Sequence, residues 1–206
     1  MKKMALWLVV YTMVLLWSLY QPHDIFTWWM EALPSLIALP LLGWFYWKHR
    51  PTPLISVLVL LHCCVLFVGA KYTYAEVPLF DWIAELFDWQ RNNYDKLGHF
   101  AQGFIPAMLC REVLLRHNVL KPSGWCGFLC VCFALALSAF YELIEWWVAV
   151  ATGDGAEAFL GTQGYVWDTQ SDMLFALIGA ICAMVTLSGW HNRQLAALKQ
   201  LSKTSA

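Results

Sequence analysis

Three short stretches of the chain each place two ionisable side chains three or four residues apart, the spacing that puts both on one face of a helix. Carboxylates and an imidazole are the ligand types that hold a divalent metal ion between helices. They also suit general acid–base catalysis, because carboxylates crowded together and shielded from water differ in how tightly they hold a proton. The three pairs are Asp95 with His99, Glu142 with Glu145, and Asp168 with Asp172.

The elements that must position these pairs are membrane-spanning helices. The chain has 206 residues, of which 60% are hydrophobic and 13% charged, about half the charged share of a soluble domain. A spanning helix needs roughly 20 apolar residues, and Trp and Tyr bracket the apolar runs as they do at membrane interfaces. We therefore predict an all-α, polytopic transmembrane helical bundle forming one domain over residues 1–206. Its six spans are expected at about 4–20, 28–47, 54–70, 97–115, 124–150 and 168–190.

Composition also excludes several classes of protein. A disordered tail, a coiled coil and a secreted disulfide scaffold do not fit a chain this apolar. The formal net charge of −1 predicts no nucleic-acid partner, so the expected partner is the lipid bilayer. The seven Cys fall almost entirely inside apolar runs, where we interpret them as small hydrophobic side chains packed between helices. The oligomeric state is left open.

The distribution of Lys and Arg predicts the orientation in the membrane. The two termini and the second and fourth loops together carry 10 of the 13 basic residues, and the first, third and fifth loops carry 3. By the positive-inside rule both termini lie in the cytoplasm, and all three ionisable pairs lie at the outward ends of their helices. Arg111 and Glu112, at the inner end of the fourth span, are interpreted as snorkelling charges that control topology. His62, in the middle of the third span, is interpreted as a core histidine bonded to a backbone carbonyl.

The third loop contains an amphipathic segment over residues 78–89, with its large apolar side chains near one face. Such a helix is expected to lie in the outer membrane interface. It could cover the polar pairs as a lid or connect two spans, and we favour the connector.

The residues around the three pairs resemble those of the YjdF-like inner-membrane proteins of bacteria. The matching motifs are Asn93-Tyr-Asp95-Lys96-Leu-Gly98-His99-Phe-Ala-Gln-Gly103, Glu142-Leu-Ile-Glu145-Trp-Trp, and Gly161-Thr-Gln-Gly with Trp167-Asp168-Thr-Gln-Ser-Asp172. The resemblance covers most of the chain and implies an inner-membrane protein, in a family with no established activity. Asp95-Lys96-x-x-His99-Phe, with Asp168-x-x-x-Asp172 and Gly179, is more distantly similar to VanZ-like proteins, which are linked to glycopeptide resistance. Ala176 and Leu177 stand where those proteins usually carry Asn.

Together these features predict a periplasm-facing site for an envelope lipid or lipid-linked sugar. In the enzyme hypothesis, His99 and some of the acids hold a divalent metal ion whose bound water attacks, and another carboxylate handles the proton. The protein would then be a metal-dependent membrane hydrolase or transferase. The alternatives are a non-enzymatic envelope-binding factor, a cation-coupled transporter, or a cluster that only holds helices together. The expected catalytic residues are Asp95, His99, Glu142, Glu145, Asp168 and Asp172, and the expected substrate contacts are Lys96, Gln102, Gln163 and Trp167.

Overall fold

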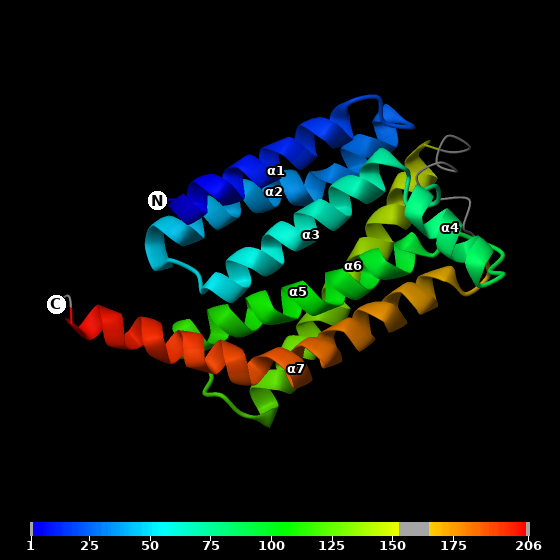
Figure 1. Cartoon of the computed structure of the whole chain (residues 1–206). Coiled ribbons are helices and arrows are strands. Elements are labelled where there is room, and N and C mark those ends of the chain that lie inside the picture. Colours follow the sequence, from blue (N-terminus) through cyan, green and yellow to red (C-terminus); the bar gives the residue numbers. More distant parts are fainter. Residues whose placement is uncertain (1, 153–164, 205–206) are drawn as a thin grey trace.

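The computed structural model describes residues 2–152 and 165–204, which form seven α-helices and no strand (Figure 1). The all-α fold class is therefore confirmed. The helices are α1 (Lys2–Leu19), α2 (Ile25–His49), α3 (Pro53–Lys71), α4 (Pro78–Leu86), α5 (Tyr94–Arg116), α6 (Gly124–Thr152) and α7 (Asp168–Thr204).

Four of these helices, α2, α3, α6 and α7, are long and apolar enough to cross a membrane. The apolar part of α1, Met4–Leu19, is shorter. The remaining predicted span corresponds to α5, which is more polar because it is buried among other helices rather than facing lipid, with both Lys96 and Arg111 inside the bundle. The division into six spans and one domain stays a prediction.

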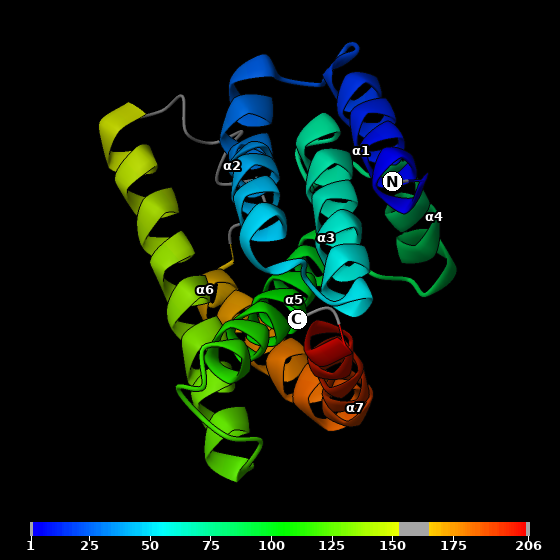
Figure 2. The same ribbon diagram turned by 90° about the vertical axis from the view of Figure 1, so that its left-hand side faces the viewer.

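The helices form two groups, joined by α3 and α5 (Figures 1 and 2). In one group α3 packs against α1 and α2, and in the other α5 packs against α6 and, most extensively, α7. Contacts between α3 and α5 connect the groups. The main core lies at that junction and includes Tyr11, Phe67 and Met108, all nearly inaccessible to solvent. Cys126 and Cys130 are buried in a second core with small alanines, so the prediction that these cysteines pack as small hydrophobic side chains is confirmed.

Two glycines allow α5 and α7 to approach closely. A Cβ on Gly103 would collide with the backbone of Ala176, and a Cβ on Gly179 would collide with the backbone of Phe100. This close approach brings the polar side chains at the start of α5 and those at the start of α7 within contact distance.

Both chain ends lie at one end of the bundle, and α4 lies at the other (Figure 1). The placement of both termini on the cytoplasmic side of the membrane stays a prediction. At the α4 end, α2 begins with Asp24 as its N-cap, whose carboxylate accepts a hydrogen bond from the Thr27 amide at 2.6 Å. That bond lowers the pKa of Asp24, because it stabilises the charged carboxylate.

The amphipathic helix of the third loop is present but ends at Leu86, because Asp88 adopts a left-handed backbone conformation. Its large apolar side chains, such as Leu79 and Trp82, point outward and are exposed. The side chain of Asn92 donates a hydrogen bond to Asp81 and so ties α4 to the start of α5. These features favour the connector over the lid.

The cytoplasmic-snorkelling interpretation of Arg111 and Glu112 is wrong. Both side chains are buried, because α7 continues far beyond the expected end at residue 190 and supplies polar partners for them. Arg111 donates to His191 Nδ1 at 2.6 Å, and His191 Nε2 lies 2.8 Å from Glu112 Oε2. Glu112 also accepts a bond from the amide of Thr52, the N-cap of α3. This network links α3, α5 and α7 at the end of the bundle where the chain termini lie.

Candidate functional site

A cavity of about 150 Å³ lies at the α4 end of the bundle, with walls from α2, α3, α5, α6 and α7. Besides His62 of α3, six acidic or imidazole side chains from four other helices line it. They are Glu31 from α2, Asp95 and His99 from α5, Glu145 from α6, and Asp168 and Asp172 from α7. The three predicted pairs thus converge on one place, since Glu142 also reaches His99.

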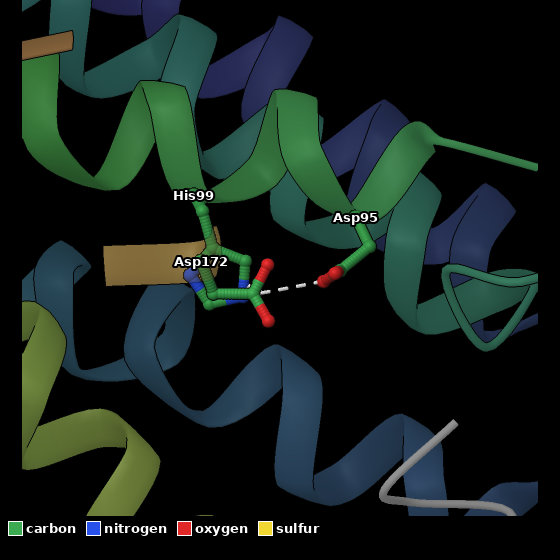
Figure 3. A group of neighbouring side chains, drawn as sticks. All are labelled: Asp95, His99 and Asp172. Atoms are coloured by element: carbon green, nitrogen blue, oxygen red, sulfur yellow. Dashed lines mark ion pairs between the residues drawn. The ribbon is translucent and has the colours of Figure 1, made fainter. Parts of the chain in front are cut away.

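His99 is the centre of this arrangement. Its Nε2 lies 3.2 Å from Asp95 Oδ1, one turn earlier on the same helix, and 3.8 Å from Asp172 Oδ1. Figure 3 shows the side chains of Asp95 and His99 directed to the same side of α5, toward Asp172. The other ring nitrogen, Nδ1, faces α6 and lies 3.9 Å from Glu142 Oε1. The imidazole therefore separates two groups of carboxylates.

On the α7 side of His99 the carboxylates form ion pairs with cations. Lys96 Nζ lies 2.5 Å from Asp172 Oδ1, 2.8 Å from Asp168 Oδ1 and 3.4 Å from Asp95 Oδ2. Arg91 adds a second cation, with its Nη2 3.2 Å from Asp168 Oδ1. We call these five side chains the paired half. Lys96 is buried, so three surrounding carboxylates replace the water that it has lost.

On the α6 side the carboxylates have no such partner. No Lys or Arg forms an ion pair with Glu31, Glu142 or Glu145 within the described part of the chain. His99 and Glu142 are each more than nine-tenths buried, and His99 Nδ1 and Glu142 Oε1 have no hydrogen-bond partner. We call His99 Nδ1 with Glu142, Glu145 and Glu31 the open half. Its surplus negative charge has to be met by protons or by a bound cation.

Two residues of the site, Glu31 and Tyr141, escaped the sequence analysis, and a third, His62, was interpreted there as a core histidine. Glu31 lies in α2, where it accepts a hydrogen bond from the Tyr141 hydroxyl at 3.3 Å. His62 lines the cavity, and its Nε2 is buried without a partner, so the expected bond from this nitrogen to a backbone carbonyl is not seen in the described structure. An intramembrane Glu was the one available signal for Glu31, because an ionisable group in a span marks a candidate site by itself. His62 carried the same signal and was interpreted as a core residue, whereas for Tyr141 the sequence held no such signal.

The structure divides the four residues expected to contact substrate. Gln102 lines the cavity, one turn beyond His99 on α5. Lys96 belongs to the paired half and is held by the acids. Trp167 is 64% exposed and does not line the cavity. Gln163 lies outside the described residues.

Two groups of three side chains that could hold a metal ion share His99 among the described residues. One joins it to Asp95 and Asp172, the other to Glu142 and Glu145, and in each group one ligand atom per residue lies within 4.8 Å of the others. The two acids of the first group belong to the paired half, where Lys96 already contacts both of them. The second belongs to the open half. The donor set of one imidazole and two carboxylates is one that divalent metal ions accept.

The chain is similar to known membrane proteins over most of its length. The family described as "Predicted membrane protein (DUF2238)" matches residues 3–193. "Inner membrane protein YjdF" of Escherichia coli strain K12 is 47% identical over 184 residues, which cover 89% of this chain and 88% of that protein. No solved structure matches the chain. The resemblance to the YjdF-like proteins is confirmed, and the more distant similarity to VanZ-like proteins stays a prediction.

Proposed function

The chain belongs to the DUF2238 family of predicted membrane proteins, and we propose that its cavity binds the head group of an envelope lipid or lipid-linked sugar and acts on it as a hydrolase or transferase. The E. coli relative is named an inner membrane protein, and we assign this chain to the same membrane. With both termini in the cytoplasm, as the excess of basic residues on that side favours, the cavity faces the periplasm.

The observation that carries the proposal is the open half of the site. Buried carboxylates without a counter-cation are costly in a membrane protein, and a purely structural cluster gains nothing from keeping them. A carboxylate that no Lys or Arg neutralises can accept hydrogen bonds from hydroxyl groups and take a proton from water or an alcohol. Glu145 is the best placed of these carboxylates to take a proton, because it lines the cavity and its side chain forms no hydrogen bond within the described residues.

The size and charge of the cavity support a particular kind of head group. A cavity of about 150 Å³ holds one benzene-sized group, so a small polar head group or one edge of a sugar ring fits. The carboxylates repel a phosphate, which places any phosphate of the ligand outside the open half. The amide of Gln102 and the acids offer partners for several hydroxyl groups.

A groove beside the paired half supports a lipid as the carrier of that head group. It is lined by large apolar side chains, among them Phe80, Phe100 and Phe175, together with Arg91 and Lys96. We assign it to a hydrocarbon chain, because its volume of about 780 Å³ suits a long substituent and its aromatic side chains are partly exposed where the bundle faces lipid.

A transporter is less well supported. Below the cavity, the buried side chains of α5 are apolar over more than one helical turn, including Ile105, Ala107 and Met108. The next buried charges on α5, Arg111 and Glu112, are tied into the network at the other end of the bundle. Between these two clusters the described helices offer an ion isolated buried hydroxyl groups, such as those of Ser35 and Ser138, and no charged partner.

The proposed activity is tested by following lipids directly. Protein purified in detergent is incubated with a bacterial inner-membrane lipid extract and with lipid-linked sugars, and substrates and products are measured by liquid chromatography and mass spectrometry. We expect turnover by the wild type and a loss of at least about 100-fold in Glu145→Gln. Glu85→Gln, which removes an exposed acid from α4, is the matched control and keeps full activity. An unchanged lipid profile with the wild type, or equal rates in Glu145→Gln, would contradict the proposal.

A further inference from the structure

We propose that His99 Nδ1, Glu142 and Glu145 bind one first-row divalent metal ion, and that Asp95 is a positioning residue for the imidazole. The inference deepens the proposed function, on which it rests for its purpose, by naming the cofactor class of the open half. The sequence left all five acids and His99 as equal candidates. The structure separates them.

Two buried atoms lack hydrogen-bond partners at the position where the ion would sit. His99 Nδ1 and Glu142 Oε1 have no hydrogen-bond partner, and they are 3.9 Å apart. That separation is too long for a hydrogen bond, which reaches about 3.2 Å. It is shorter than the roughly 4.3 Å that two donors of one zinc ion can span, since each lies about 2.0–2.2 Å from the metal.

Asp95 contacts the imidazole nitrogen of His99 that faces away from the proposed ion. A metal-bound histidine almost always donates its other ring N–H to a carboxylate or a carbonyl, which fixes the tautomer and the ring orientation. Asp95 Oδ1 lies 3.2 Å from His99 Nε2, so it holds the proton on that nitrogen and leaves the Nδ1 lone pair directed at α6 (Figure 3).

The other candidate metal site, formed by Asp95, His99 and Asp172, is disfavoured by Lys96. Lys96 Nζ already lies between these acids, 2.5 Å from Asp172 and 3.4 Å from Asp95. A divalent ion there would stand beside a buried ammonium group, and the repulsion between like charges disfavours it. No Lys or Arg forms an ion pair with Glu142 or Glu145 in the described structure.

The three proposed ligands lie close enough together to bind one ion. The ligand atoms of His99, Glu142 and Glu145 lie within 4.8 Å of one another. The side chain of Glu145 forms no hydrogen bond within the described residues, so it can turn toward the ion without breaking one. Three protein ligands leave a coordination position for water or substrate, as catalytic sites require, and an ion there lowers the pKa of its bound water to about 7.

The test is metal binding in the absence of any lipid. Detergent-purified protein is stripped with chelator, dialysed and titrated with Zn²⁺ and Mn²⁺ by isothermal titration calorimetry, and the bound metal is then counted by elemental mass spectrometry. We expect close to one ion per chain, lost in both His99→Ala and Glu145→Gln. Asp95→Asn should weaken binding about 10–100-fold, because the ring loses its orienting partner.

Asp172→Asn is the variant that separates the two groups. It removes a carboxylate at the same depth from the paired half, and we expect it to retain the ion. If Asp172→Asn loses the ion while Glu145→Gln keeps it, or if the wild type binds neither metal, the inference is overturned. Helical circular dichroism and size-exclusion profiles show that each variant is folded, and Glu142→Gln replaces any variant that is not, with the same expected loss. Lipid retention by the metal-free protein separates failure of this inference from failure of the proposed function.

Discussion

Lys96→Met should destabilise the protein by several kcal/mol, because it removes the buried cation from the paired half of the site. The ammonium group lies 2.5 to 3.4 Å from three carboxylates, those of Asp95, Asp168 and Asp172. Removing one partner of a buried ion pair costs about 3–5 kcal/mol, since the charge left behind has no compensation. At about 2–4 °C per kcal/mol for a chain of this size, the midpoint of thermal unfolding should fall by roughly 6–20 °C.

The assay is thermal unfolding in detergent with chelator present, so that metal binding does not contribute. Lys121→Met, which removes an exposed lysine, is the control and should unfold within about 1 °C of the wild type. The double variant Lys96→Met with Asp172→Asn should recover a large part of the loss, because one of the uncompensated charges is gone. If Lys96→Met unfolds within about 1 kcal/mol of the wild type, the division into a paired and an open half is wrong.

Four further predictions follow from other contacts. Glu145→Gln should stabilise the chelated protein by about 1–3 kcal/mol, because it removes one charge from the uncompensated acids; a loss of stability in thermal unfolding would contradict this. Gly179→Val should cost at least about 3 kcal/mol or prevent folding, because the new side chain meets the α5 backbone, and size-exclusion profiles with unfolding curves will show it. Glu112→Gln should cost about 2–4 kcal/mol in the same assay, since it disrupts a fully buried network. Asp24→Ala should cost about 1 kcal/mol at pH 7 through loss of the α2 cap. The Thr27 bond lowers the pKa of Asp24, so the cap's contribution is present above the unfolded carboxyl pKa of about 3.9 and is lost as the pH falls through the folded value, and unfolding at pH 7 and pH 3 should show the difference shrinking.

Much of this architecture could be read from the sequence, because hydrophobic run length and helical spacing are local properties. The pairing of Asp95 with His99 and of Glu142 with Glu145 needed only the helical period, and the expectation that they converge needed only the shared end of their helices. The end of α7 was missed by about 14 residues, since a polar helix outside the apolar run gives no membrane signal. Its length matters, because it carries His191 to Glu112.

The division of the site could not be predicted in the same way. It depends on which carboxylates the single chain of Lys96 reaches, and that is set by the close approach of α5 and α7 at their glycines. The membership of Glu31 depends on how α2 packs beside α6, seen in its bond from Tyr141. Such contacts join residues far apart in the chain, where neither spacing nor periodicity carries information.

The cavity is proposed to bind the head group of a lipid or lipid-linked sugar. Native mass spectrometry of protein purified from bacterial membranes tests this claim most directly, by comparing the lipids retained by the wild type and by Gln102→Trp, whose indole fills the cavity. Val113→Trp adds the same group at an exposed position of α5 and serves as the control. We predict a defined lipid species on the wild type and on Val113→Trp that is absent from Gln102→Trp. Equal retention by all three proteins, or only unselective bulk phospholipid on each, would contradict the claim.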